Sequence, residues 1–297
     1  MNKAIDNNSE AVERKTVHLM ENTMYIQNYF PDNGDYIGDD GIVVCGLCGN
    51  PKGYAGRPFA KVFGHDYVVL IPDYCQCQKE KMKELKSEEA EAHVKATREN
   101  KRNKGLQSDA YKHMRLGNTD FSKGNASQLK IAIQYSQALK NKHINKGLIF
   151  SGTCGTGKTH VAACIANELI DSGIDVYMDT IGGMVRSATD FKTDQAFMLM
   201  LASADLVVID DFGTERSTAN ANEKIFQIID ERIRSKKPMI ITTNLSEDEL
   251  RNPTDIQKQR LYSRILSACG VVSFKGNDIR LTYEAEQTKA ELQNLFD

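Results

Sequence analysis

The chain has 297 residues, with 38 Lys and Arg against 40 Asp and Glu, which gives a formal net charge of -2 at pH 7. Hydrophobic residues make up 40% and charged residues 26%, which excludes a disordered chain, a collagen-like chain and a histone-like basic protein. The length allows one large domain or two modest ones, and nucleic-acid binding at this charge would depend on a local basic patch.

The N-terminal residues 9–30 predict an amphipathic helix. Apolar side chains recur there at roughly helical spacing, namely Val12, Val17, Leu19, Met20, Met24 and Ile26. Residues 31–77 are instead rich in Gly and Tyr, and their short apolar runs suit small β-ribbons. Residues 1–10 are polar, and no stretch reaches the roughly 18–20 apolar residues of a membrane span, so we expect a cytoplasmic protein without a secretory signal or membrane contact.

Four of the seven cysteines form two close pairs, Cys45 with Cys48 and Cys75 with Cys77. In a reducing compartment such pairs are more typical of metal ligation than of a disulfide framework. The spacing predicts a structural Zn²⁺ site with four thiolate ligands. The second pair is tighter than the usual Cys-x-x-Cys, which leaves His65 open as a substitute ligand. Unliganded thiols are the alternative.

Residues 78–104 are almost all Lys, Glu, Arg and Ala, without Gly or Pro, which predicts a solvated helix. It is either a polar spacer between domains or a helix that binds a partner. From Leu129 onward, apolar runs at 148–150, 176–178, 206–209, 239–242 and 271–274 alternate with helical patterns. This alternation predicts βαβ units, and hence a parallel sheet covered by helices.

The segment from Gly152 to Thr159 reads GTCGTGKT and matches the phosphate-binding loop, with a strand before it and a helical pattern after it. Glycines let backbone N–H groups approach phosphate oxygens, and the start of the next helix points its positive end at them. We expect Lys158 to reach the β- and γ-phosphates of ATP and the Thr159 hydroxyl to ligate Mg²⁺. The expected nucleotide contacts come from Gly152, Thr153, Cys154, Gly155, Thr156, Gly157, Lys158, Thr159 and His160. The Cys154 side chain is incidental, because the loop works through its backbone.

Two acids, Asp210 and Asp211, end the apolar run at 206–209. A strand without polar residues belongs at the centre of a parallel sheet, where its carboxyl end meets the ligand crevice. We expect Asp210 to hold Mg²⁺, largely through water, and Asp211 to polarise the attacking water. Asn244 is the polar end of the next strand-like segment, IITTN at 240–244, and is placed to orient that water.

Three arginines follow in the chain. Arg260 and Arg264 lie four residues apart, on one face of an expected helix, and Arg280 follows the last predicted strand. Surface arginines are common, so each is a weak signal alone. Their order after Asp210 and Asn244 is what gives them weight.

Through these residues the sequence resembles AAA+ ATPases of the DnaC/DnaI helicase-loader and IstB family. The shared elements are GTCGTGKT, LVVIDDFGTE, IITTN, RLYSR and FKGNDIR, in that order, and the resemblance covers about residues 118–285. It implies an AAA+ P-loop fold with a parallel five-stranded sheet flanked by helices. It further implies that the phosphate loop is Walker A, Asp210 and Asp211 are Walker B, Asn244 is sensor 1, Arg264 is the arginine finger with Arg260 beside it, and Arg280 is the sensor 2 arginine.

The sequence departs from the wider AAA+ pattern at Asp211, where Glu is usual. The short stretch after Arg280 implies that a full C-terminal lid is lacking. An arginine finger acts on the nucleotide of a neighbouring copy, so the resemblance implies assembly into a ring or spiral through Arg264 and hydrolysis that assembly or DNA stimulates. Loaders of the DnaI type carry an N-terminal zinc module that contacts the helicase, and by resemblance the cysteine-bearing part here binds a replicative DnaB-type helicase.

The expected organisation is a small helical and zinc-binding N-terminal domain at 1–77, a charged helical linker at 78–117 and an AAA+ ATPase domain at 118–297. The leading hypothesis is an ATP-dependent helicase loader that also binds single-stranded DNA. The alternative is an IstB-like transposition helper that acts on duplex DNA. A metabolic P-loop kinase and a zinc-stabilised adaptor that does not turn nucleotide over are weaker hypotheses. Local positive charge for DNA is expected from Lys101, Arg102, Lys104, Lys236, Lys237 and Lys275.

Overall fold

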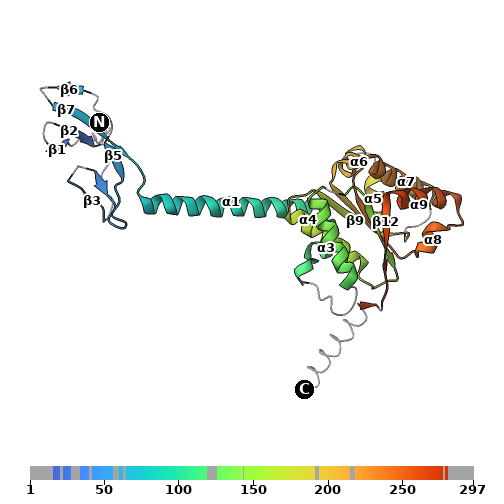
Figure 1. Ribbon diagram of the computed structural model, residues 1–297. Helices are drawn as coiled ribbons and strands as arrows, with labels where there is room; N and C mark the ends of the chain where they lie inside the picture. Colours follow the sequence, from blue (N-terminus) through green and yellow to red (C-terminus); the bar gives the residue numbers. More distant parts are fainter. Residues whose placement is uncertain are drawn as a thin grey trace, which may run out of the picture. The chain divides into compact units, whose positions relative to one another are not determined.

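A computed structural model describes residues 16–20, 23–27, 34–39, 42–55, 60–62, 65–118, 126–142, 144–190, 194–214, 218–276 and 278–279 (Figure 1). The chain divides into two compact units, Met1–His93 and Val94–Asp297. Within the described residues, no helix combines the length and the apolar character that crossing a membrane requires.

The first unit is built from short strands. They are β1 (Thr16–Met20), β2 (Thr23–Gln27), β3 (Tyr36–Ile37), β4 (Val43–Val44), β5 (Gly53–Ala55), β6 (Ala60–Val62) and β7 (His65–Pro72). One sheet has the order β1-β2-β7-β5, with β6 also paired to β7, and β3 pairs with β4 in a separate antiparallel ribbon. The expected β-ribbons before the second cysteine pair are therefore confirmed.

The helix expected over residues 9–30 is wrong in its described part, and with it the helical character expected there for the domain at 1–77. Thr16–Met20 and Thr23–Gln27 are antiparallel strands, and β2 continues in parallel pairing with β7. The segment is rich in Thr, Val, Tyr and Ile, whose branched or aromatic side chains suit a pleated surface better than a helix. Pairing with β7 supplies hydrogen bonds that a roughly helical apolar spacing does not reveal.

Helix α1 (Gln76–Gly105) corresponds to the charged helix expected over 78–104. Its last turn belongs to the core of the second unit. Arg102 is only 4% exposed; its Nε donates to Asn167 Oδ1 at 2.8 Å, and its guanidinium pairs with Asp171. Leu106 is buried, and the Gln107 N–H donates to the Met178 carbonyl at 3.0 Å. This end of the segment is thus packed rather than solvated.

The second unit alternates helices and parallel strands. They are α2 (Asp109–His113), the 3-10 turn η1 (Leu116–Asn118), α3 (Ala126–Lys140), β8 (Gly147–Gly152), α4 (Lys158–Asp171), β9 (Val176–Thr180), α5 (Ile181–Thr189), α6 (Asp194–Ser203), β10 (Leu206–Phe212), α7 (Ala219–Arg234), β11 (Met239–Thr243), α8 (Glu247–Arg251), α9 (Ile256–Ala268) and β12 (Cys269–Phe274). The five strands run parallel in the order β12-β8-β11-β10-β9, which confirms the expected sheet.

Helices cover both faces of this sheet (Figure 1). Side chains alternate along β10, so that Leu206 and Val208 pack in the cluster with α3 and α4, while Val207 and Ile209 pack in the cluster with α5, α6, α7 and α9. All five strands end at one edge. Strand order reverses beside β8, and an open parallel sheet binds its ligand at such a point, outside the carboxyl ends of the strands.

Candidate functional site

The phosphate loop connects the carboxyl end of β8 to the first residue of α4, as the motif predicts. Gly155 and Gly157 have φ angles of 74° and 88°, in the left-handed region that glycine adopts without a steric cost. A Cβ at Gly155 would overlap the Asp278 carboxylate. The glycines therefore serve both the turn of the loop and a close approach of the chain segment that precedes Arg280.

Lys158 begins α4 and is 6% exposed. Its ammonium nitrogen donates to the carbonyls of Gly152 and Thr153, at 2.9 and 2.6 Å, so the side chain lies back along the loop. Because α4 starts here, its first backbone N–H groups point toward the loop and favour an anion. The next residues, Thr159 and His160, are partly buried, and burial lowers the pKa of His160.

Asp210 lies near the end of β10 and is 2% exposed. Three hydroxyl groups donate to its carboxylate. Those of Thr159 and Thr242 reach Oδ1, at 2.8 and 2.6 Å, and that of Tyr111 reaches Oδ2 at 2.9 Å. These donors offset the loss of hydration that burial of a carboxylate imposes. The Thr159 hydroxyl and the Asp210 carboxylate together form an oxygen-rich pair of the kind Mg²⁺ takes as ligands, so the residues fit a Mg²⁺ site.

Tyr111 comes from α2, outside the sheet, and its ring is buried. Burial, together with the nearby carboxylates of Asp210, Asp179 and Asp211, raises the pKa of Tyr111 above its usual range. The phenol is therefore neutral at physiological pH and acts as a hydrogen-bond donor to Asp210.

Asp211 sits in a bulge of β10. Ile209 is opposite Ile241 and Phe212 is opposite Thr243, so β10 contains one residue more than β11 over this stretch. Asp211 has a φ of 53°, its N–H donates to the Thr242 hydroxyl at 3.0 Å, and its side chain is exposed. The bulge turns this second acid out of the sheet, beside the buried Asp210.

Asn244 directly follows β11 and is exposed. Since β11 lies between β8 and β10, the structure places Asn244 at the edge between the phosphate loop and the two acids. The residues on either side of Asn244 are hydrogen-bonded to the two neighbouring strands, β10 and β8. The Thr243 hydroxyl donates to the Phe212 carbonyl at 2.7 Å, and the Ser151 hydroxyl donates to the Leu245 carbonyl at 2.6 Å.

The last predicted site residue on this edge, Arg280, lies outside the described residues, as do the residues that follow it. The two described residues before it lie on the phosphate loop. The Ile279 N–H donates to the Gly155 carbonyl at 3.0 Å, and Asp278 is in contact with the same glycine.

The segment that contains this nucleotide-binding edge of the sheet matches a known protein family. The model of the family described as IstB-like ATP binding protein matches residues 76–287. The chain belongs to this family. The match extends over all of α1 and the whole second unit up to residue 287, and it confirms the resemblance to DnaC-like AAA+ ATPases.

Several proteins with sequences similar to this IstB-like chain are named as helicase loaders. The chain is 34% identical to "Replicative helicase loader DnaC" of Escherichia coli (strain K12) over 122 residues, which is 39% of this chain and 49% of that protein. It is 30% identical to DnaC of Buchnera aphidicola subsp. Schizaphis graminum over 167 residues, 54% of this chain and 63% of that protein. The crystal structure of a DnaC helicase loader is 26% identical, with a TM-score of 0.47, over 57% of this chain and 100% of that chain. The chain spans about half the length of the first curated relatives it matches.

The two candidate finger arginines, Arg260 and Arg264, lie on α9, on the sheet face opposite α4. Arg264 is partly exposed, forms an ion pair with Asp230 of α7, and its guanidinium carbon lies 4.8 Å from the centre of the Phe226 ring. Asp230 also pairs with Arg234 at 2.8 Å. Arg260, one turn earlier on α9, is exposed. The structure thus holds Arg264 on the surface in a defined place, and its role as a finger stays a prediction.

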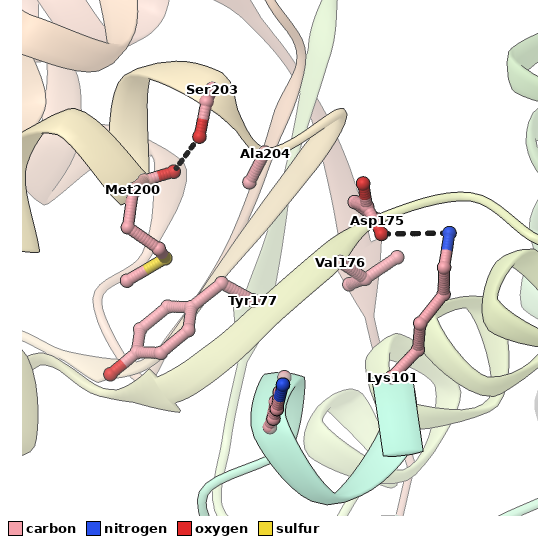
Figure 2. A pocket seen from close by; sticks show the side chains of 9 residues that line it. Lys101, Asp175, Val176, Tyr177, Met200, Ser203 and Ala204 are labelled. Atoms are coloured by element: carbon pink, nitrogen blue, oxygen red, sulfur yellow. Dashed lines mark hydrogen bonds and ion pairs between the residues drawn. The ribbon is translucent and has the colours of Figure 1, made fainter. Parts of the chain in front are cut away.

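Part of the expected basic DNA surface is wrong. Arg102 is buried against Asn167 and Asp171, so its guanidinium is not accessible to a DNA phosphate. Lys101 is paired with Asp175 at 2.9 Å, beside a cavity of about 290 Å³ between the end of α1, the start of β9 and the end of α6 (Figure 2). Lys237 is paired with Asp205 at 3.5 Å. The exposed members of the predicted set are Lys104, Lys236 and Lys275.

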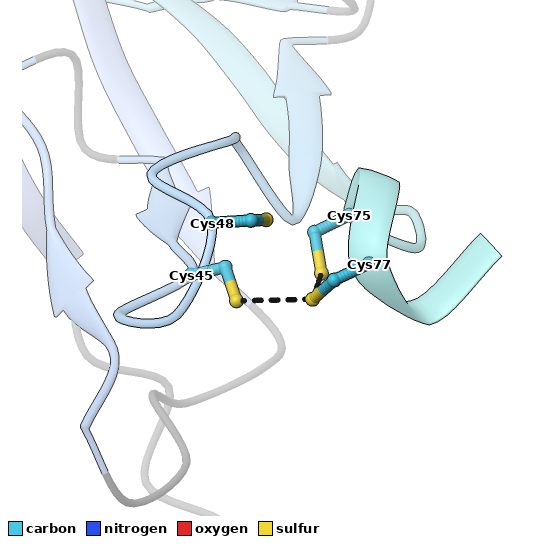
Figure 3. A group of neighbouring side chains, drawn as sticks. All are labelled: Cys45, Cys48, Cys75 and Cys77. Atoms are coloured by element: carbon cyan, nitrogen blue, oxygen red, sulfur yellow. Dashed lines mark hydrogen bonds between the residues drawn. The ribbon is translucent and has the colours of Figure 1, made fainter. Parts of the chain in front are cut away.

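The four cysteines of the two pairs meet in the first unit. Their sulfur atoms all lie within 4.8 Å of one another, with Cys45 to Cys77 at 3.7 Å and Cys75 to Cys77 at 3.2 Å, and no disulfide joins them (Figure 3). Four sulfurs on a tetrahedral Zn²⁺ at about 2.3 Å would lie about 3.8 Å apart, so the residues fit a Cys₄ zinc site. His65 belongs to β7, and its side chain lies outside the described residues.

Local backbone structure prepares these thiols for a cation. Backbone N–H groups of Cys77 and Asn50 lower the pKa of Cys48 to about 6, and N–H groups of Cys48 and Leu47 lower that of Cys45. Side-chain hydrogen bonds with Cys75 and Cys48 raise the pKa of Cys77 to about 12. Four thiolates therefore cannot share this space without a positive charge between them, which is what a bound metal supplies.

Sequence reasoning missed three features of the nucleotide edge: Tyr111, Thr242 and the bulge at Asp211. Thr242 lies in the IITTN element and is the polar last residue of the run at 239–242 by which that strand was recognised, so its place two residues before Asn244 was an available signal. Tyr111 carried none, since it lies in a segment between two recognisable patterns.

Proposed function

We propose that this chain is an ATPase that binds Mg²⁺ and ATP on the carboxyl edge of its parallel sheet and loads a DnaB-type replicative helicase. The observation that carries the ATPase part is the meeting of Lys158, Thr159 and Asp210 at one edge. Lys158 and Thr159 open the same helix, and the Thr159 hydroxyl lies 2.8 Å from the Asp210 carboxylate. The helicase part rests on the named activity of the DnaC relatives, carried over to this chain.

The chain's own groups divide the work as follows. The Lys158 ammonium exchanges the loop carbonyls for oxygens of the β- and γ-phosphates, while the N–H groups at the start of α4 bind the β-phosphate. Mg²⁺, when bound, neutralises charge on the phosphates. Thr159 and Asp210 would hold it. Asp211 and Asn244 flank the position of an attacking water, which they orient and polarise. Arg264 of a second copy stabilises charge on the transferring phosphoryl group.

The cysteine cluster would hold structural Zn²⁺ and so keep the first unit folded around it. We propose that this unit contacts the helicase. Large apolar side chains are exposed near the cluster, among them Leu47, which lies between Cys45 and Cys48 and is 93% exposed. A protein surface that covers Leu47 would remove that apolar area from water, which favours association.

A pull-down with a purified hexameric replicative helicase tests the loader role. The wild-type chain is expected to retain the helicase, more strongly with ATP than without it. Leu47→Asp should abolish retention while ATP turnover remains, and Leu199→Asp, at an exposed leucine of the second unit, serves as the matched control. Failure of the wild-type chain to retain any hexameric replicative helicase, with or without ATP, would exclude the loader role.

The family match itself favours a second candidate, a transposition helper of IstB type that acts on duplex DNA. Fluorescence anisotropy with single- and double-stranded oligonucleotides distinguishes the two. The loader is expected to prefer single strands and to bind them more tightly with ATP. A clear preference for duplex would replace the loader by the transposition helper.

A further inference from the structure

The Tyr111 hydroxyl is part of the carboxylate site although it comes from outside every nucleotide motif. It donates to Asp210 Oδ2 at 2.9 Å, and both side chains are buried. Among the hydrogen bonds of the described residues, the other two donors to this carboxylate, Thr159 and Thr242, both reach Oδ1. Tyr111 is thus the group that holds the second oxygen in place.

These hydrogen bonds connect Tyr111, through the Asp210 carboxylate, to the Thr159 hydroxyl at the proposed Mg²⁺ position. Thr159 donates its hydroxyl hydrogen to Asp210 Oδ1, which leaves the lone pairs of that hydroxyl directed away from Asp210 and free to ligate a cation. The direction of that hydrogen bond depends on the plane of the carboxylate. Because Tyr111 holds Oδ2, it fixes this plane, and with it the orientation of the Thr159 hydroxyl.

The backbone of Tyr111 is held independently of its hydroxyl. The buried Asn167 side chain of α4 donates from Nδ2 to the Tyr111 carbonyl at 2.7 Å and to the Met114 carbonyl at 2.8 Å. Asn167 also accepts from Arg102 at the end of α1. The segment that carries Tyr111 is therefore tied to the same helix that begins with Lys158 and Thr159.

We propose that Tyr111 is a positioning residue for the Mg²⁺ site, where its hydroxyl holds the Asp210 carboxylate in the plane that lets Thr159 face the metal. This proposal rests on the Mg²⁺ and ATP site proposed above. Removal of the hydroxyl leaves a buried carboxylate oxygen without its donor, a loss that is large for a charged acceptor. The carboxylate then turns to recover a partner, and Thr159 loses its direction.

The test is the Mg²⁺ dependence of nucleotide binding in Tyr111→Phe, which keeps the buried ring and the backbone contacts to Asn167. A fluorescent ATP analogue is bound in EDTA and Mg²⁺ is then titrated in, so that no turnover is measured. Tyr111→Phe is expected to raise the Mg²⁺ concentration at half-effect about tenfold, with affinity in EDTA unchanged. Tyr135→Phe is the matched control, because Tyr135 is equally buried but its hydroxyl donates to the Lys146 carbonyl at 2.8 Å.

The outcomes distinguish the positioning role of Tyr111 from the proposed Mg²⁺ and ATP site on which it rests. If the wild-type chain binds the analogue with no response to Mg²⁺, the Mg²⁺ site itself is refuted. If the wild-type chain responds and Tyr111→Phe responds identically, the positioning role is refuted while the site stands. A hydrogen-exchange measurement on the wild-type chain covers the case in which Tyr111→Phe does not fold. The amides of residues 111–114 should exchange more slowly with nucleotide and Mg²⁺ than with nucleotide alone, and equal rates would overturn the proposal.

Discussion

The two candidate metal sites of this chain differ in what surrounds them. The edge that carries Asp210 stands on two large apolar clusters, one on each face of a five-stranded sheet. The cysteine cluster stands on short strands, and the buried apolar residues described in its unit are Val43, Cys45 and Cys75. Two of these three are themselves cluster members. The nucleotide edge thus lies on a sheet with an apolar core of its own, while the cysteine cluster supplies two of the three buried apolar side chains described in its unit.

The largest expected effect is therefore on folding, and it is confined to the first unit. Cys45→Ser should release the metal and unfold residues before α1, because in small zinc modules metal binding supplies about 10 kcal/mol or more of the folding free energy. The second unit should keep its thermal transition. Metal analysis should find about one Zn²⁺ per wild-type chain and almost none in the variant.

The control for this experiment is Cys154→Ser, at an exposed cysteine of the phosphate loop, which should retain the metal. Zinc that is absent from wild-type protein purified under reducing conditions would refute the site. Loss of the second unit's transition in Cys45→Ser would refute the independence of the two units.

In the second unit, the largest expected effect is on chemistry. Arg264→Ala should lower ATP turnover by about 10³-fold or more while nucleotide binding is kept, because an arginine finger acts on charge that develops in the transition state. Folding should be unchanged, since Asp230 keeps its ion pair with Arg234. Mixing Arg264→Ala with Lys158→Ala should restore part of the activity, because one copy offers the pocket and the other the arginine.

Arg260→Ala, one turn away on the same exposed helix face, is the matched comparison. If Arg260→Ala removes turnover and Arg264→Ala does not, the finger is Arg260. If both arginine variants lose ATP turnover equally, and mixing with Lys158→Ala restores none of it, a site shared between copies is refuted.

Lys158→Ala should lower ATP turnover by about 10²- to 10³-fold, since the variant lacks a preorganised cation at the β- and γ-phosphates. The thermal transition should remain, in contrast to the effect of Cys45→Ser on its unit. Lys146→Ala is the control, because Lys146 lies at the opposite end of β8 and donates to the Ser267 carbonyl. Turnover in Lys158→Ala at the wild-type rate would show that the nucleotide lies elsewhere.

The smallest expected effect concerns DNA. Binding to single strands should weaken steeply with salt, and Lys275→Ala should reduce the salt slope by about 0.7, the value for one phosphate contact. Lys101→Ala should leave the slope unchanged, because Lys101 is paired with Asp175. Anisotropy titrations at several salt concentrations measure both slopes. A reduction in Lys101→Ala that equals the one in Lys275→Ala would place the DNA contact at the end of α1.

The sequence was most informative where a local pattern and a long-range constraint agree. Each of the five parallel strands is an apolar run next to a helical pattern, and the glycines of the phosphate loop have a backbone requirement that shows in their spacing. The prediction failed where pairing decides the structure, as for Thr23–Gln27, which becomes a strand because β7 lies beside it. It also failed for Arg102, whose place in a charged helix indicated solvent, although the side chain is buried by α4.

The left-handed backbone at Asp211 favours Asp as the acid at this position. Among residues other than Gly, Asn and Asp adopt a φ near 53° most readily, while Lys142 and Lys236 show that longer side chains also take it in this chain. The departure from the Glu that is usual in the wider family is then a matter of conformation. The identity of the acid and the shape of the strand are then linked, which predicts that a left-handed backbone at this position is rarer among relatives that carry Glu there.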